Sequence, residues 1–286
     1  MKTLGVIANC DKPESHETLL ALARLCRDLD LSLVACDETA RHLPGSRTVR
    51  PSALRKHIDA LLVLGGDGTL LRAVHILGES EVPIVGVNLG ALGFLTNVAI
   101  ENMERALTHL KRGEFTISER TTLACTARRA KKTLGKYRAL NDSVIGWVRA
   151  ARIITVDATI GNDHIASYRC DGVVVSTPTG STGHSLSAGG PIVHPGSKVL
   201  LLNVICPHAL STRPLILPDD AKLTLKITVA ARPLILSVDG QEKTILRQGD
   251  ELLIQRHSTN ARFIRLPDYS YFGVLRHKLQ WRGSNV

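Results

Sequence analysis

LLVLGGDGT, residues 61–69, is the stretch that decides the fold of this chain. Its apolar part predicts a buried strand, and the glycines predict a tight turn out of that strand. Glycine backbone N–H groups can approach a phosphate closely, and residues 69–77 predict a helix whose N-terminus favours an anion. Asp67 would lie where the phosphate lies, so it should bind a cation or receive a proton. The stretch therefore indicates phosphoryl transfer, although purely steric glycine turns are also common.

Apolar runs on both sides of this stretch repeat the same pattern. Leu4–Ala8, Leu31–Cys36 and Ile84–Asn88 predict buried strands, and apolar residues from Leu19 to Leu29 recur at helical spacing. Strands that alternate with helices predict a parallel sheet. Residues 37–57 are polar and predict a connection with one short helix.

A second glycine-bearing loop, NLGALGFL at residues 88–95, follows the strand at Ile84–Asn88. Open α/β sheets bind ligands at the carboxyl ends of their strands, so this loop is a second candidate part of the site. Phe94 in the loop is either a core residue or part of the site. A helix from Glu101 to Lys111, ended by Gly113, would close the first domain.

The pattern changes near residue 116 from helical spacing to short strands with turn signals. Lys222–Val229, for example, alternates apolar and polar residues as a half-buried antiparallel strand does. We therefore expect an α/β domain with a parallel sheet over residues 1–115 and a β-rich, sandwich-like domain over residues 116–268. Residues 269–286 return to helical spacing and should pack on the first domain.

Composition narrows the functional classes. The net charge of +10 suits a protein that attracts anions, but an aromatic content of 3% argues against an aromatic platform for single-stranded nucleic acid. Six cysteines without a CxxC pair indicate reduced, structural thiols. No signal peptide or membrane-length apolar run is visible, so we expect a soluble, cytoplasmic protein. The basic run Arg128–Arg138 predicts an exposed hairpin that is either simply solvated or binds an anion.

The longest informative stretch is DGVVVSTPTGSTGHSLSAGGPIVHP at Asp171–Pro195. An apolar strand runs into a loop crowded with hydroxyls and glycines. Such a density of donors suits a ligand rich in phosphate, ribose and amide oxygens better than it suits a core.

This stretch resembles the long signature of NAD kinases of the bacterial type, DGxxxSTPTGSTAYxxSAGGPxxxP. Diacylglycerol kinases and phosphofructokinases share the GGDGT motif with that family but not the long signature. Further matches to NAD kinases are NLGALGF at 88–94, LND at 140–142, RPLILP at 213–218, VDGQ at 238–241 and YFGVLR at 271–276.

The resemblance implies transfer of the terminal phosphoryl of ATP, or of polyphosphate in some members, to the 2′-hydroxyl of the adenosine ribose of NAD, which yields NADP. It implies Mg²⁺ with the phosphates, no separate metal ligands in the protein, and a homodimer or homotetramer. Asp67 would be the catalytic base, and Gly65, Gly66, Gly68 and Thr69 the phosphate cradle. The residues that it assigns to NAD are Phe94, Asn141, Asp142, Arg169, Asp171, Thr179, Thr182, Gly183, His184, Ser187 and Asp239.

One pair departs from the signature, because Gly183-His184 replaces Ala-Tyr within the expected dinucleotide pocket. The change puts the fit of the ligand in question rather than the reaction. The sequence leaves two alternative interpretations open: a lipid kinase of the same superfamily, and a non-catalytic NAD sensor. A nucleic-acid binder that uses the Arg128–Arg138 run is disfavoured by the scarcity of aromatic residues, and no membrane partner is expected.

Overall fold

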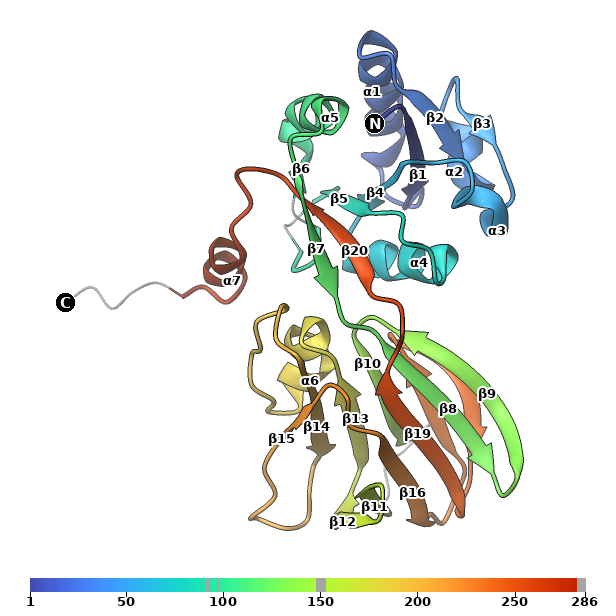
Figure 1. Ribbon diagram of the computed structural model, residues 1–286, viewed down its shortest axis with the longest axis vertical. Helices are drawn as coiled ribbons and strands as arrows, with labels where there is room; N and C mark the ends of the chain where they lie inside the picture. The colour runs from blue at the N-terminus through green and yellow to red at the C-terminus, as the bar shows by residue number, and fades with distance from the viewer. Residues whose placement is uncertain (91–92, 97, 148–152, 282–286) are drawn as a thin grey trace, which may run out of the picture. The chain divides into compact units, whose positions relative to one another are not determined.

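The computed structural model describes residues 1–90, 93–96, 98–147 and 153–281. It divides into two compact units (Figure 1). Unit 1 comprises Met1–Glu119 and Ala261–Val286, and unit 2 comprises Arg120–Asn260. Each unit has its own hydrophobic core. No helix in the described ranges is long and apolar enough to cross a membrane.

Unit 1 is built on a sheet, here called sheet A, with the strand order β3-β2-β1-β4-β5-β20-β7 and with β6 paired to β5. The pairs β1–β2, β1–β4, β2–β3, β4–β5, β5–β6 and β5–β20 are parallel, which confirms the expected parallel sheet. The strands are β1 (Thr3–Ala8), β2 (Ser32–Ala35), β3 (Arg47–Thr48), β4 (Ala60–Gly65), β5 (Ile84–Asn88), β6 (Val98–Ala99), β7 (Thr116–Arg120) and β20 (Ala261–Arg265).

Helices cover both faces of sheet A, which explains why its central strand is apolar throughout. All residues of β4 are buried. Helices α1 (Ser15–Asp28) and α5 (Met103–Arg112) share one core with Leu62 and Leu64. On the opposite face, a Cβ added at Gly86 of β5 would lie 2.9 Å from the Leu70 side chain of α4 (Asp67–Leu77), so the glycine permits close packing of that helix.

Some helices of unit 1 begin or end where the sequence signals predict, and others do not. Helix α5 ends at Gly113, which has a left-handed φ of +76°. Helix α4 begins at Asp67, two residues before the expected start. The connection after β2 holds two short helices, α2 (Asp37–His42) and α3 (Pro51–Leu54), instead of one. Short polar helices have no apolar periodicity, so sequence pattern alone misses them.

Strands β7 and β20 move the unit boundaries away from those that we expected. Both strands pair within sheet A, so unit 1 extends to Glu119 and resumes at Ala261 rather than ending at 115 and resuming at 269. The C-terminal helix α7 (Tyr271–Lys278) follows β20 in the same unit, and its Val274 and Leu275 are buried.

Unit 2 is a sandwich of two antiparallel sheets, as expected. Sheet B has the order β12-β11-β16-β19-β8-β9, and sheet C has the order β15-β14-β13-β10-β17-β18. Their strands are β8 (Leu123–Arg129), β9 (Lys132–Ala139), β10 (Asp142–Trp147), β11 (Ile154–Ile160), β12 (Asp163–Cys170), β13 (Gly172–Ser176), β14 (Val199–Ile205), β15 (Leu215–Pro218), β16 (Leu223–Val229), β17 (Leu234–Val238), β18 (Gln241–Leu246) and β19 (Asp250–Arg256).

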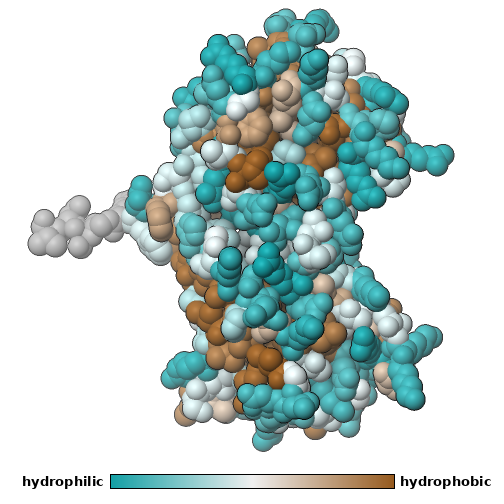
Figure 2. Space-filling view, viewed as in Figure 1, coloured by the Kyte–Doolittle hydropathy of each residue, from teal (hydrophilic) through white to brown (hydrophobic). Residues whose placement is uncertain are grey.

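The inner faces of sheets B and C form the core of unit 2. Leu223, Leu225 and Ile227 of β16 are buried in that core while the residues between them are more exposed, as the alternation predicts. The basic run forms the β8–β9 hairpin. Hydrophobic residues also reach the surface: Figure 2 shows them gathered over the side of unit 2 where Figure 1 places β14 and β15, and Leu210 and Ile216 are exposed.

Candidate functional site

The glycine turn between β4 and α4 leaves backbone N–H groups open at the start of a helix. A Cβ at Gly65 would lie 2.4 Å from the Thr69 hydroxyl oxygen, so this position requires glycine for close packing. Apart from adjoining residues and the backbone of α4 itself, no atom of the described residues lies within 4 Å of a Cβ built at Gly66 or Gly68, so these two glycines leave room for a ligand.

A cavity of about 350 Å³ lies against this turn; we call it the glycine-turn cavity. Lys12 and Arg72 bring positive charge to it, and their side chains donate to the carbonyl oxygens of Leu89 at 2.7 Å and Ala8 at 3.0 Å. Cations beside a helix N-terminus form a suitable environment for phosphate. The cavity is lined by Asn9, Lys12, Gly66, Gly68, Thr69 and Arg72.

Lys12 and Arg72 were not among the residues that we predicted. A signal for Lys12 exists in the sequence, because it follows β1, whose carboxyl end lies beside that of β4 in a parallel sheet. Arg72 lies on α4 five residues after Asp67, and nothing in the local pattern distinguishes it from an ordinary surface arginine.

Asp67 holds the loop that follows β5. Its carboxylate accepts hydrogen bonds from the backbone N–H groups of Phe94 at 2.9 Å, Leu95 at 3.0 Å and Thr96 at 3.3 Å. Gly93 is packed so tightly against this carboxylate that a Cβ there would lie 2.1 Å from Asp67 Oδ1. The structure thus brings Asp67 and this loop together; residues 91 and 92 of the loop lie outside the described residues. A role for Asp67 as catalytic base stays a prediction.

Phe94 is half-buried, so it is neither a core residue nor a free surface ring. The ammonium of Lys278, on α7, lies 5.6 Å from the centre of its ring, within the range of a cation–π contact. This contact links the loop after β5 to the C-terminal helix within unit 1. Contact of Phe94 with NAD stays a prediction.

A second group of predicted residues gathers in unit 2, where β10 begins and β13 ends. Asp142 pairs with Ser176 across these two strands. The Asp239 carboxylate accepts hydrogen bonds from the backbone N–H groups of Leu140, Asn141 and Asp142 at 2.8, 2.7 and 3.2 Å. Asp239 therefore positions the Asn141–Asp142 pair, and its direct contact with NAD stays a prediction.

Asp142 is a buried acid with an unusual protonation equilibrium. Burial, followed by the nearby charge of Asp239, raises the pKa of Asp142 to about 7, while a hydrogen bond from the backbone N–H of His184 acts in the opposite direction. The carboxyl group thus titrates close to neutral pH and can either accept or donate a hydrogen bond there.

Hydroxyl groups in the loop after β13, residues 177–187, mostly serve the fold. Thr177 donates to the Leu140 carbonyl oxygen at 2.6 Å, and Ser181 donates to that of Pro178 at 2.7 Å. Asn203 of β14 donates to the Ser185 hydroxyl at 2.7 Å. Buried backbone carbonyl groups need hydrogen-bond donors, so these three hydroxyls have structural partners, whereas the assignment of Thr179, Thr182 and Ser187 to NAD stays a prediction.

Buried polar atoms without a hydrogen-bond partner in the described part of the chain include Asn141 Oδ1 and Thr179 Oγ1 here, as well as Asn203 Oδ1 against the same loop. Buried polar atoms are normally paired, so an unpaired one marks a place for a ligand or water. Among the other predicted loop residues, Thr182 makes only a long contact of 3.4 Å to the Thr179 carbonyl oxygen, and Ser187 is exposed.

The Gly183-His184 pair lies directly against the Asn141–Asp142 pair. A Cβ at Gly183 would lie 3.7 Å from both Asn141 Nδ2 and Asp142 Oδ2, and 3.3 Å from the Gly180 carbonyl oxygen. The alanine of the signature would therefore fit with little adjustment. The His184 side chain is exposed at the start of α6 (His184–Ser187), so its stacking on a ligand stays a prediction.

Arg169 and Asp171 do not join this group within one chain. Asp171 directly precedes β13 and Arg169 lies near the end of β12, whereas Asp142 and the loop 177–187 lie at the other end of β13, roughly 16 Å away along that strand. Adjacency in the signature does not survive as adjacency in space, since an extended strand separates the two ends. Their assignment to NAD stays a prediction.

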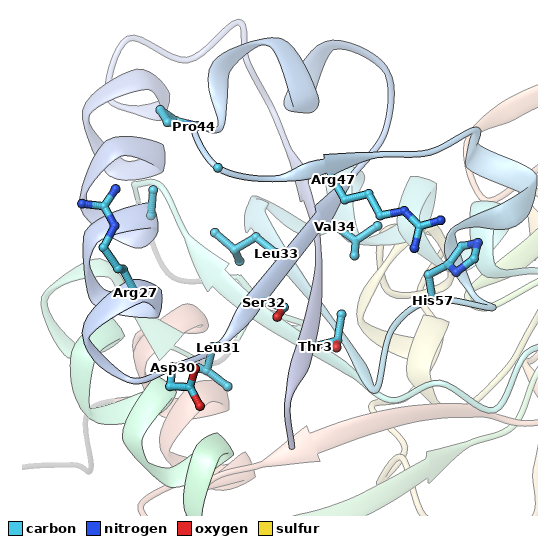
Figure 3. Close-up of a pocket in the computed structure, with 12 residues that line it drawn as sticks. Thr3, Arg27, Asp30, Leu31, Ser32, Leu33, Val34, Pro44, Arg47 and His57 are labelled. Carbon is cyan, nitrogen blue, oxygen red and sulfur yellow. The ribbon is translucent and has the colours of Figure 1, made fainter.

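A larger cavity of about 620 Å³ in unit 1 contains none of the predicted site residues (Figure 3). Thr3 and Ser32, at the amino ends of β1 and β2, line it together with Arg27 and Arg47. Ligands of open α/β sheets bind at the opposite, carboxyl ends of the strands. Cavity size therefore does not locate the site in this protein.

Comparisons with known proteins agree with this geometry. The family profile of the ATP-NAD kinase N-terminal domain matches residues 4–115, and that of the ATP-NAD kinase C-terminal domain matches residues 140–266. The chain belongs to the ATP-NAD kinase family. The NAD kinase of Geotalea daltonii is 36% identical over 281 residues, which are 98% of this chain and 99% of that protein. The NAD kinase of Gemmatimonas aurantiaca is 42% identical over 227 residues, 79% of this chain and 78% of that protein.

Two solved structures share the fold of this family member. Yeast NADH kinase, complexed with NADH, has a TM-score of 0.90 at 24% identity and covers 99% of this chain and 89% of its own. The NAD kinase from Archaeoglobus fulgidus, in complex with ATP, has a TM-score of 0.76 at 23% identity and covers 99% and 100%. The expected fold class and family are thereby confirmed.

Proposed function

We propose that this protein transfers the terminal phosphoryl group of ATP to the 2′-hydroxyl of the adenosine ribose of NAD, producing NADP. The observation that carries the proposal is the pair of buried, unpartnered oxygens, Asn141 Oδ1 and Thr179 Oγ1, beside the titratable Asp142. A ligand with ribose hydroxyls and an amide supplies the donors that these atoms lack.

The glycine-turn cavity supports the phosphate half of the proposal. Lys12, Arg72 and the N-terminus of α4 offer positive charge and donors to a polyanion. These features do not distinguish ATP from polyphosphate, which share phosphoryl oxygens, so a polyphosphate donor is part of the assay below.

A divalent cation such as Mg²⁺ fits this site as a companion of the phosphates. Asp67, the carboxylate at the glycine turn, is occupied by three backbone N–H groups, so the protein offers few anionic ligands of its own. Mg²⁺ commonly takes most of its ligands from substrate phosphates and water. When bound, it would neutralise charge that develops on the transferred group.

Asp67 has two ways to contribute. Its hydrogen bonds to Phe94, Leu95 and Thr96 organise the loop after β5, and release of one carboxylate oxygen would let it accept the proton of the attacking hydroxyl. In a loose phosphoryl transition state, positioning contributes more than basicity. We therefore infer that Asp67 acts chiefly by orienting the reacting groups.

The decisive experiment incubates purified protein with NAD, Mg²⁺ and either ATP or polyphosphate, and measures NADP with an NADP-specific dehydrogenase. We expect NADP to form with ATP, and Asp67→Asn to lower turnover by at least ~10²-fold, the usual scale for a positioned acid–base group. NAD binding without any NADP would indicate a sensor instead of a kinase. Near-normal turnover of the Asp67→Asn variant would remove this residue from the mechanism.

Assembly and location belong to the same proposal. We infer a homodimer or homotetramer from the family resemblance, and the exposed Leu210 and Ile216 on unit 2 give such an assembly apolar surface to bury. Light scattering after size-exclusion chromatography measures the assembly directly. A cytoplasmic location remains the expectation from the sequence.

A further inference from the structure

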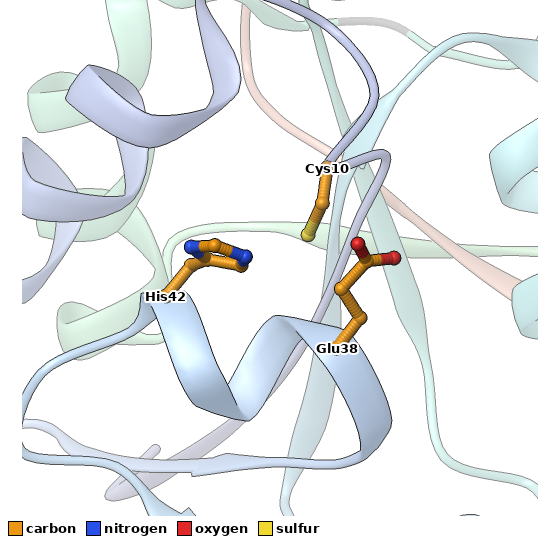
Figure 4. A group of neighbouring side chains, drawn as sticks. All are labelled: Cys10, Glu38 and His42. Atoms are coloured by element: carbon orange, nitrogen blue, oxygen red, sulfur yellow. The ribbon is translucent and has the colours of Figure 1, made fainter.

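A second set of chemically active side chains lies in unit 1, outside the proposed site. Cys10 follows β1, and Glu38 and His42 lie one turn apart on α2, so they share one face of that helix. Figure 4 shows the three side chains pointing toward one another. The Cys10 sulfur, a Glu38 carboxylate oxygen and a His42 ring nitrogen all lie within 4.8 Å of one another.

A fourth donor lies at the edge of this cluster. His16, in the first turn of α1, has its ring centre 6.0 Å from that of His42, with the two planes at 87°. Side chains of His16, Glu38 and His42 are exposed, so an ion can reach the cluster from solvent without any opening of the core.

The backbone around the cluster is fixed by a neighbouring contact. The hydroxyl of Thr39, a buried residue of α2, accepts a hydrogen bond from the Ala8 backbone N–H at 2.9 Å. This bond ties α2 to the end of β1, which carries Cys10 two residues later. Preorganised backbone is what allows side chains from two elements to converge on one ion.

We propose that Cys10, Glu38 and His42, with His16 as the adjacent fourth donor, form a binding site for Zn²⁺ that is separate from the glycine-turn cavity. One sulfur, imidazole nitrogen and a carboxylate oxygen are the donors that zinc takes in proteins. Magnesium and calcium instead prefer all-oxygen sites, so the thiol and imidazole select against them.

Cys10 carries a thiol, which must lose its proton before the sulfur can bind a metal ion. Zinc would bind the thiolate and release that proton to solvent, with no change of oxidation state.

This site adjoins the proposed phosphate cavity through the chain itself. Asn9 and Lys12, on either side of Cys10, line the glycine-turn cavity. An ion bound at Cys10 would hold this segment in place. The proposal nevertheless stands without the kinase activity, because its test measures metal binding and not turnover.

The test titrates the purified, full-length protein with Zn²⁺ in competition with a chromophoric zinc chelator, and repeats the titration with Co²⁺. We expect one ion per chain at this site, a thiolate-to-cobalt charge-transfer band in the near ultraviolet, and release of a proton on binding in weakly buffered solution. Cys10→Ser and His42→Ala should each weaken zinc binding by at least about 100-fold, more than loss of an outer partner usually costs.

Cys206→Ser is the matched control, because Cys206 is an exposed cysteine of unit 2. It should bind Zn²⁺ and Co²⁺ as the wild type does. Thermal unfolding of each variant without metal checks that the half-buried or exposed substitutions leave the fold intact. Wild-type protein that fails to compete with the chelator, zinc affinity that is unchanged in Cys10→Ser, or a cobalt band that disappears in Cys206→Ser would each overturn the proposal.

Discussion

At the scale of single residues, the three acidic side chains Asp67, Asp142 and Asp239 differ in what their carboxyl groups contact. The carboxylates of Asp67 and Asp239 each accept hydrogen bonds from backbone N–H groups of a neighbouring segment. Asp142 is instead buried close to the like charge of Asp239, and these two effects raise its pKa to about 7. Of these three carboxyl groups, Asp142 is thus the one whose protonation can change near neutral pH when a ligand binds.

Replacement of Asp142 by asparagine tests this raised pKa, because the pKa makes the free energy of unfolding depend on pH. Because the folded state raises the pKa of Asp142 to about 7, it binds the proton more tightly than the unfolded chain, whose aspartate titrates near ~3.9. Protonated Asp142 therefore stabilises the folded state fully below pH ~4, and this stabilisation is lost as the pH rises toward about 7. It amounts to about 4 kcal/mol at most, at 1.36 kcal/mol per pKa unit.

Asp142→Asn should remove this pH dependence, since the amide stays neutral. Urea unfolding at several pH values between 4 and 8 should show the variant more stable than the wild type at pH 8, with the difference shrinking toward pH 4. Asp163, the exposed first residue of β12, supplies a control, and Asp163→Asn should follow the wild-type profile. Parallel curves for wild type and Asp142→Asn across this range would contradict a raised pKa at Asp142.

At the scale of elements, the site in unit 2 depends on how closely the loop after β13 packs on the start of β10. The Thr177 N–H donates to the Asn141 carbonyl oxygen at 2.9 Å, and the Thr177 hydroxyl donates to Leu140. Gly180 comes even closer, because a Cβ there would lie 2.2 Å from the Asn141 carbonyl oxygen. The loop can reach the Asn141–Asp142 pair only with glycine at position 180.

Gly180→Ala should therefore displace the loop and weaken NAD binding. The atoms that its methyl group meets belong to the Asn141 backbone, which cannot turn aside as a flexible side chain can. Overpacking of this kind costs about 1–3 kcal/mol, so we expect NAD affinity to fall by about tenfold or more, as measured by calorimetry.

The neighbouring glycine provides the matched control. Gly183→Ala adds the same methyl group three residues later, where the nearest atom is 3.3 Å away, and it restores the residue of the family signature. Its NAD affinity should stay within about threefold of the wild type. Equal losses in both variants would mean that general loop disorder, rather than the close approach at Gly180, controls binding.

At the scale of the whole molecule, the sequence predicted most of the fold because its signals are local. Continuous apolar runs gave β4 and β5, and alternation gave β16. Strand β20 was placed in the wrong domain, since its pairing with β5 joins residues far apart in the chain. The boundaries near 119 and 261 depend on such long-range pairing, which no local pattern records.

Site residues could be predicted from the sequence where the motif also places them at the end of a strand. Asp67 and Asn141–Asp142 lie at strand ends, where topology brings them into sites. Asp171 belongs to the same motif as Thr179 but lies at the other end of β13. The partners of the loop hydroxyls could not be read from the sequence, because hydroxyls bind a ligand and backbone carbonyl groups equally well.

The division of the chain leads to the last prediction, which concerns unit 2 by itself. Sheets B and C lie wholly within residues 120–260, and this continuous segment contains its own core. Unit 1 instead needs both Met1–Glu119 and the strand β20 that returns to its sheet. A continuous segment with a complete core can fold alone, whereas loss of β20 removes one neighbour of β5 and leaves β7 without its neighbour in the sheet.

We therefore expect the fragment Arg120–Asn260 to unfold in one cooperative transition. Its midpoint should lie no more than about 10 °C below that of unit 2 in the full chain, equivalent to about 3 kcal/mol for a domain of this size. Circular dichroism gives the midpoint, and dispersed amide signals in an NMR spectrum report fixed packing. The matched fragment Met1–Glu119, which lacks β20 and α7, should show no cooperative transition. A fragment Arg120–Asn260 that melts without cooperativity would mean that unit 1 is required to form the sandwich.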